Sequence, residues 1–135
     1  MPKMIFINLP IVDLTASIAF YEALGATQNP KFSDPTGACM VLSESIHVMA
    51  LTHEKYSKFT ARPIADVHAT SGALIALSFD SRDEVNATID RAVLAGGQAD
   101  TNPVQDHGFM FSRSVQDPDG HVWEIFWMDA AVAGA

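Results

Sequence analysis

Short apolar runs and amphipathic stretches alternate along the chain, and the arrangement occurs twice. Residues 4–9 are apolar and rich in isoleucine, which predicts a buried strand. The next stretch begins at Asp13, a good helix N-cap, and carries apolar residues at helical spacing. It reaches Gly25, a residue type that favours the end of a helix. The first unit is therefore predicted to be a strand followed by a helix.

The second half of the chain repeats this unit. Residues 73–79 predict a strand, and Ser81 and Glu84 have the spacing of a capping box at the start of a helix. A glycine pair beginning at Gly96 predicts the end of that helix. Gly25 and Gly96 are 71 residues apart (96 minus 25), which is about half of the chain. A duplicated module explains this offset.

Strand-like sequence follows each predicted helix. In the first half it covers residues 27–32, 39–43 and 46–52, and the last two runs suggest a hairpin. In the second half it covers residues 98–104, 109–115 and 121–127, with an Asp-Pro-Asp-Gly turn before the last run. Each half is therefore predicted to be β-α-β-β-β. The predicted fold class is α+β, with two such modules forming mixed sheets.

We expect a single domain built from these modules. Module one covers about residues 1–52, a linker about 53–71, module two about 72–129, and a frayed tail 130–135. The linker is polar and irregular. It is either a solvated connection or a flap over a pocket that contacts anions through its basic residues, Lys55, Lys58 and Arg62.

Composition narrows the functional classes. Apolar residues make up 48% of the 135 residues, enough for a core without disulfides, and the net charge of −8 argues against binding nucleic acid or anionic membranes. The single cysteine, Cys39, excludes an intrachain disulfide and cysteine-rich metal sites. No apolar run approaches the roughly 20 residues that span a bilayer, and residues 1–3 lack a signal-peptide pattern. We expect a cytoplasmic protein.

Two motifs resemble the vicinal oxygen chelate superfamily, also called the glyoxalase, bleomycin-resistance and extradiol-dioxygenase superfamily. The first is Leu9-Pro10-Ile11-Val12-Asp13-Leu14, followed by Ser17, Phe20-Tyr21 and Leu24-Gly25; the second is Asp117-Pro118-Asp119-Gly120-His121-Val122-Trp123-Glu124. The resemblance implies two curved sheets that partly enclose a cavity, helices on the outer faces, and a homodimer. It also implies one divalent metal ion, held by side chains on the first and last strands of each module.

The resemblance places the four metal positions at Phe6, Ala50, Leu74 and Glu124. Glu124 alone carries a donor atom, and a shift of one residue at Ala50 or Leu74 restores none. A shift of two residues at Phe6 would bring in Asn8, a poor ligand. We therefore expect that the metal site is degenerate and that no cofactor is bound, although the five histidines leave room for an unexpected metal site.

Strand alternation predicts a mostly apolar lining for the cavity. Its expected members, which either contact a ligand or fill the space themselves, are Phe6, Asn8, Val48, Ala50, Leu74, Ala76, Ser78 and Glu124, with Phe126 beyond them. Glu124 either pairs with Arg113 or contacts a ligand, and Arg113 is also an expected ligand-binding residue. His107, beside Asp106, is the candidate partner of Glu124 in catalysis, or a loop histidine held by Asp106. The same alternation places His47 toward the helices.

These expectations favour a metal-free protein that binds or sequesters a small molecule, with Glu124 and His107 as the groups for any metal-independent activity. One alternative is a divalent-metal-dependent lyase (lactoylglutathione-lyase-like), isomerase or dioxygenase. Another is a structural or regulatory dimer without a ligand. The sequence leaves open whether the protein is an enzyme.

Overall fold

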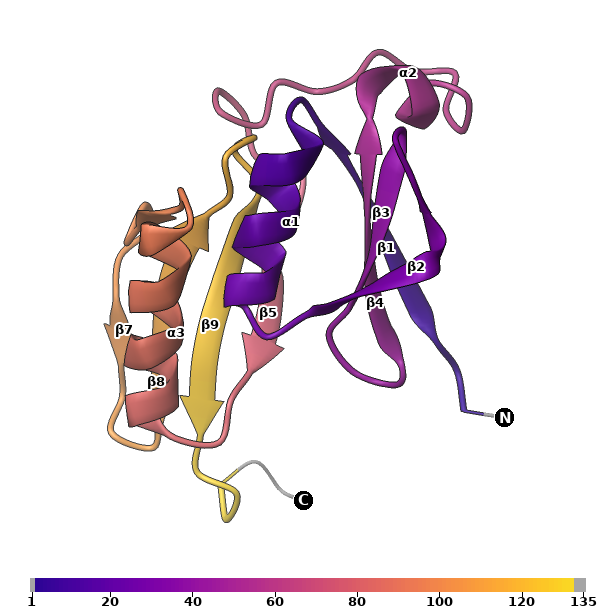
Figure 1. The fold of residues 1–135 in the computed structure, drawn as a ribbon. Coiled ribbons are helices and arrows are strands. Elements are labelled where there is room, and N and C mark those ends of the chain that lie inside the picture. The colour runs from indigo at the N-terminus through magenta and orange to yellow at the C-terminus, as the bar shows by residue number, and fades with distance from the viewer. Residues whose placement is uncertain (1, 133–135) are drawn as a thin grey trace.

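The computed structural model describes residues 2–132; residues 133–135 of the expected tail lie outside the described residues. Two strand–helix–strand units follow each other along the chain, as the sequence predicts (Figure 1). The elements are β1 (Ile5–Ile11), α1 (Leu14–Ala23), β2 (Thr27–Asp34), β3 (Gly37–Val41), β4 (Ile46–Thr52), α2 (His53–Tyr56), β5 (Ile75–Ser78), α3 (Arg82–Leu94), β6 (Gln98–Ala99), β7 (Gln105–Asp106), β8 (Met110–Gln116) and β9 (Val122–Met128). The α+β class is confirmed.

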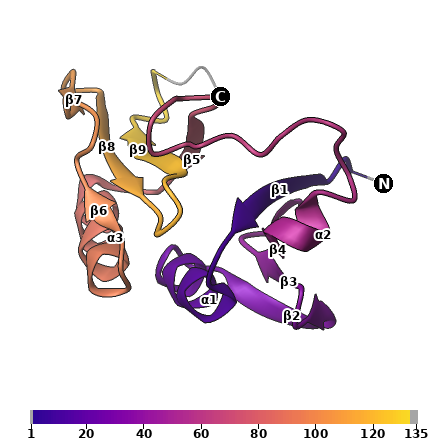
Figure 2. The same cartoon turned by 90° about the horizontal axis from the view of Figure 1, so that it is seen from above.

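Each module forms its own mixed sheet with the same topology. The first sheet has the order β1-β4-β3-β2, and the second has the order β5-β9-β8-β6, with β7 also paired to β8. The first and last long strands of each module run parallel (β1 with β4, β5 with β9), and the remaining pairs are antiparallel. The sheets do not close on each other, so β1 and β5 remain edge strands (Figure 2).

Local sequence explains both long helices. The Asp13 carboxylate accepts a hydrogen bond from the Ala16 backbone N–H (3.1 Å), and Gly25 leaves α1 with φ +104°, a conformation that costs glycine little. At α3, the Ser81 hydroxyl accepts from the Glu84 backbone N–H (3.1 Å). The Glu84 carboxylate turns back to the Asp80 backbone N–H (2.9 Å), one residue earlier than a standard capping box predicts.

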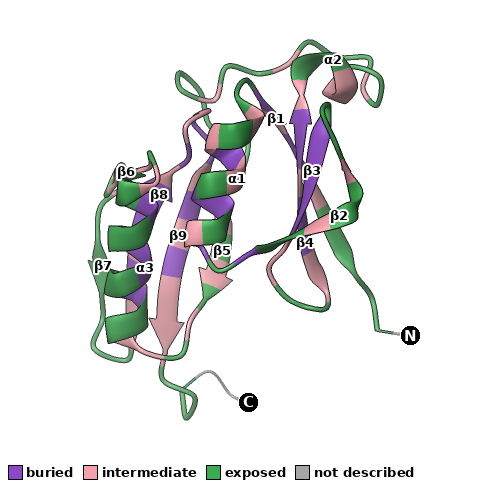
Figure 3. Ribbon diagram, in the orientation of Figure 1, coloured by how far each residue is buried: buried purple, intermediate pink, exposed green. Residues whose placement is uncertain are grey.

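Both helices pack into one core together with one side of each sheet, called here the helix-facing side. Buried residues therefore concentrate where α1, α3 and the sheets meet, and the opposite, open sides carry more exposed residues (Figure 3). The core consists of Leu9, Phe20, Tyr21, Leu24, Ala26, Ala38, Met40, Val48, Val85, Ile89, Ala92, Val115, Trp123 and Ile125. No helix within residues 2–132 is long and apolar enough to cross a membrane.

A buried polar network joins the two modules inside this core. The Tyr21 hydroxyl donates to the Asp117 carboxylate (2.6 Å) and accepts from Trp123 Nε1 (3.2 Å). The other Asp117 oxygen accepts from the backbone N–H groups of Asp119 (2.9 Å) and His121 (2.8 Å). Burial raises the pKa of the Asp117 carboxyl and, with the nearby Asp117 charge, that of Tyr21. The Asp-Pro-Asp-Gly turn is thus tied to α1.

Most strands differ by one or two residues at an end from their predicted bounds, and two of the differences have a clear local cause. β1 continues through Pro10 to Ile11, because an edge strand paired on one side tolerates a residue without an N–H. The predicted strand 98–104 is instead interrupted between β6 and β7. Asp100 adopts φ 57° there, which turns the chain out of the ladder.

Candidate ligand-binding site

A cavity of about 580 Å³ lies between the edge strands β1 and β5. Linker residues and the turn before β9 complete its wall, and aliphatic side chains dominate. Its lining residues are Ile5, Ile7, Asn8, Leu9, Pro10, Tyr56, Ala65, Val67, Thr70, Ser71, Gly72, Ala73, Leu74, Ile75, Ala76, Gly120, His121 and Val122. This volume lies within the range of about 300–1,000 Å³ that is usual for small-molecule sites.

A second hollow of about 380 Å³ adjoins the cavity and is lined by Asn8, Tyr56, Phe59 and Thr60. Asn8 and Tyr56 line both spaces. The Asn8 amide donates a hydrogen bond to the Phe6 carbonyl (3.3 Å), and its Oδ1 accepts none from the residues described. Asn8 therefore places an available polar group where the two spaces meet.

The linker forms a wall of the cavity. It runs from α2 across to β5, and Ala65, Val67 and residues 70–73 contribute to the lining (Figure 2). Its basic residues, Lys55, Lys58 and Arg62, line neither this cavity nor the adjoining hollow. Of the two interpretations, a solvated connection or a flap over a pocket, the linker fits the second, because it forms part of the cavity wall. The expected contact of its basic residues with the pocket is absent from both linings.

Three residues expected in the lining occupy it: Asn8, Leu74 and Ala76. Phe6 lies outside the lining. It stacks on His47 with ring centroids 4.4 Å apart and an interplanar angle of 14°. Ser78 is on β5 two residues beyond Ala76, past the end of the cavity.

Val48 and Ala50 face the helices instead of the expected cavity, and both are fully buried. The parallel register of β1 and β4 explains this position, because Val48 is paired with Ile7 and Ala50 with Leu9 on the helix-facing side. His47 is paired with Phe6 and shares the open side, so its expected orientation toward the helices is also corrected. The prediction that side chains alternate along β4 is sound, but it assigned Val48 and Ala50 to the side of Phe6, where His47 lies.

Glu124 borders the cavity without lining it. Its neighbours are Ala76 on the paired strand and Val122 two positions earlier, and both line the cavity. The Glu124 carboxylate accepts hydrogen bonds from Asn102 Nδ2 (3.0 Å) and the Ser112 hydroxyl (3.3 Å). Both oxygens thus have partners on the open side of the second sheet.

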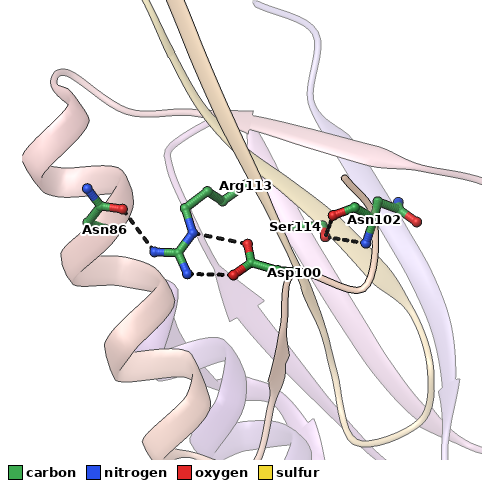
Figure 4. Close-up of polar contacts among 5 residues, drawn as sticks. All are labelled: Asn86, Asp100, Asn102, Arg113 and Ser114. Carbon is green, nitrogen blue, oxygen red and sulfur yellow. Dashed lines mark hydrogen bonds and ion pairs between the residues drawn. The ribbon is translucent and has the colours of Figure 1, made fainter. Parts of the chain in front are cut away.

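Asn102 is a neighbour of Glu124 that the sequence did not reveal. Its backbone N–H donates to the Ser114 hydroxyl (2.9 Å), which in turn lies 3.5 Å from the Asn102 carbonyl (Figure 4). Ser114 is fully buried, so this contact fixes the interrupted segment against β8. No local pattern marks Asn102, because it follows the unpredicted turn at Asp100.

Arg113 lies on the other side of the second sheet and does not pair with Glu124. Its guanidinium donates to the Asp100 carboxylate (3.0 and 2.8 Å) and to Asn86 Oδ1 on α3 (2.9 Å), as Figure 4 shows. The bonds to Asp100 raise the pKa of Arg113. Arg113 is paired in register with buried Ile125, one position out of step with Glu124, which explains the correction.

His107 is not brought to Glu124 either. Its backbone N–H donates to the Met110 carbonyl, whereas Glu124 is opposite Ser114. Ser114 is four residues beyond Met110 along β8, which is roughly 14 Å at about 3.4 Å per residue. Asp106 does not hold His107; it binds the Arg82 guanidinium in bidentate fashion (2.7 and 3.0 Å). Those bonds lower the pKa of Asp106 to about 2.

Residues 3–125 match the sequence model of the Glyoxalase/Bleomycin resistance protein/Dioxygenase superfamily. The chain belongs to this superfamily. The comparison with curated proteins gives no match.

Several solved structures share the fold. A glyoxalase-related enzyme from Fulvimarina pelagi is 25% identical with a TM-score of 0.77, covering 94% of this chain and 88% of that one. A hypothetical protein from S. aureus is 21% identical with a TM-score of 0.76, over 94% and 95% of the two chains. Fosfomycin resistance protein FosX from Mesorhizobium loti is 14% identical with a TM-score of 0.70, over 100% and 99%. These likenesses show the fold.

The superfamily implies a divalent metal ion, and Glu124 is the one residue with a donor atom at the four positions that the resemblance gives. On the open sides of the two sheets, Phe6 of β1 and Ala76 of β5 carry no donor atom, whereas His47 and Glu124 each carry one. Both Glu124 oxygens are already hydrogen-bonded. Within residues 2–132, no three His, Cys, Asp or Glu side chains are grouped so that they could hold a metal ion.

Proposed function

We propose that this chain is a superfamily member that binds and sequesters a small molecule without a metal ion, in the cavity between β1 and β5. The observation that carries the proposal is the cavity itself, with about 580 Å³ and a mostly aliphatic wall. Burial of apolar ligand surface supplies the affinity, and a few polar groups such as Asn8 orient the ligand.

The metal-free part of the proposal is supported by the donor chemistry. A catalytic divalent ion in a protein needs several nitrogen or oxygen ligands and an open coordination position. Glu124 alone offers a carboxylate at the positions expected from the superfamily, and Asn102 and Ser112 each donate a hydrogen bond to it. Metal-dependent lyase, isomerase and dioxygenase chemistry is therefore the less favoured assignment.

We further propose that the protein works as a homodimer. Large apolar side chains at the start of the chain are exposed on one copy, including Met4 (47%), Ile5 (54%) and Phe6 (48%). A second copy that covers them would remove this apolar surface from water. Light scattering coupled to gel filtration measures the mass in solution, and a mass of one chain would refute the dimer.

Nile red, a neutral dye whose fluorescence rises in apolar surroundings, tests the cavity. The wild-type protein should bind it saturably. Ala76→Trp should abolish binding, because Ala76 lines the cavity and the indole fills it. Ala87→Trp is the matched control: the same change on the exposed surface of α3, which should bind the dye like wild type. Equal binding by all three proteins would refute the site.

Elemental analysis of the dialysed protein tests the absence of a metal ion. We expect substoichiometric nickel, zinc, manganese and iron, and no change in melting temperature on addition of a chelator. One divalent ion per chain that survives dialysis would favour the metal-dependent alternative.

A further inference from the structure

The walls of the cavity and its adjoining hollow carry no charged side chain among the residues described. Tyr56 and His121 are the titratable members of the two linings. His121 Nε2 lies 2.8 Å from the Pro10 carbonyl, so the ring donates to the backbone there. The site therefore presents alkyl groups, backbone, hydroxyls and one amide.

The carboxylates near the cavity line a separate, smaller hollow. This smaller hollow of about 280 Å³ is lined by His53, Asp66, His68, Asp119 and His121 together with apolar residues, and His121 also lines the cavity. Ala65 and Val67 line both this hollow and the cavity, so these aliphatic residues form part of the partition between them. The linker thus contributes Asp66 and His68 to the smaller hollow, and it contributes no charged side chain to the cavity.

From this partition we infer that the ligand is an uncharged molecule with a large apolar part and one hydrogen-bonding group. The inference rests on the proposed function and names the ligand class for the same cavity. An ion that enters the cavity gives up part of its hydration shell and finds no charged side chain in the wall, which is unfavourable. A neutral apolar group has no charge to desolvate, and its burial in the cavity is favourable.

Asn8 and Tyr56 supply the polar contact. Asn8 Oδ1 and the Tyr56 hydroxyl make no hydrogen bond to the residues described, and both side chains line the junction of the two spaces. A ligand amide or hydroxyl at this junction gains partners, while its apolar part occupies the aliphatic cavity between β1 and β5. The ring of Phe59 lies at the other end, in the adjoining hollow.

Three naphthalenes that differ mainly in charge test the class: 2-naphthamide (neutral), 2-naphthoate (anion) and 2-naphthylmethylammonium (cation). Each competes with Nile red on the wild-type protein at about 0.15 M salt, which screens the net charge of −8. We expect the amide to bind at least about tenfold more tightly than either ion. Either ion binding within tenfold of the amide, or an amide that does not displace the dye, overturns the inference.

Asn8→Leu tests the polar contact, with 2-methylnaphthalene as the ligand that lacks a hydrogen-bonding group. The variant should weaken 2-naphthamide about two- to tenfold, the usual effect of one lost hydrogen bond, and leave 2-methylnaphthalene unchanged. Equal effects on both ligands would overturn the role of Asn8. Failure of the proposed function gives a different result. In that case Nile red does not bind to the wild-type protein, or it binds equally well to Ala76→Trp.

Discussion

The hydroxyl of Tyr21 should be one of the most important polar groups for stability, and Tyr21→Phe removes it alone. The side chain is fully buried, and its hydroxyl connects the Asp117 carboxylate with Trp123 Nε1. A hydrogen bond to a charged group contributes about 1.5–3 kcal/mol, and a buried donor left without an acceptor costs about 1–3 kcal/mol. We therefore expect Tyr21→Phe to lower the free energy of unfolding by about 3 kcal/mol.

Urea and thermal unfolding followed by circular dichroism measure this loss. At about 2.1 cal/mol/K per residue, a loss of about 3 kcal/mol lowers the melting temperature by about 10 °C for a chain of 135 residues. The other tyrosine provides the control, because the Tyr56 hydroxyl makes no hydrogen bond to described residues. Tyr56→Phe should stay within about 0.5 kcal/mol. A loss below about 1 kcal/mol for Tyr21→Phe would refute the reasoning.

Two further predictions concern the second module. The pKa of Asp106, lowered to about 2 by the Arg82 guanidinium, should return toward the ordinary carboxyl range in Arg82→Gln. The ionised Asp106 carboxylate stabilises the fold above its unfolded pKa, and this contribution is lost as the pH falls toward the folded pKa. Carboxyl NMR titration of the wild-type protein and Arg82→Gln measures the pKa of Asp106 in each. Equal pKa values in the two proteins would contradict the prediction. Gly97→Ala should destabilise by about 1–3 kcal/mol in urea unfolding, because the new methyl group would lie 2.7 Å from Phe20. Gly72→Ala, with nothing within 4 Å of its new methyl group, is the control that should remain near wild type.

The elements of the fold could be predicted because their signals are local. Asp13 and Ser81 were recognised as N-caps from sequence, and both accept the expected backbone hydrogen bonds. Gly25 and Gly96 were recognised as helix ends, and both have positive φ. Each signal spans a few residues and needs no knowledge of distant parts of the chain.

The faces of the strands could be predicted only in part. Alternation separates Val48 from His47, but it does not say which of the two shares a side with Phe6. That choice depends on the parallel register of β1 and β4, in which Phe6 is paired with His47. The same limit applies to Arg113 and Glu124, which were assigned to one side and lie on opposite sides of the second sheet.

The position of the cavity follows from the duplication, and its chemistry follows from the part of the chain that is not duplicated. Each module places its first strand at the edge of its sheet, so the two modules of the chain present two edge strands, β1 and β5. The linker must pass this gap to join the modules, and it leaves Ala65, Val67 and residues 70–73 in the wall. A repeated fold therefore supplies the opening, while a segment without a counterpart in the other module completes its wall.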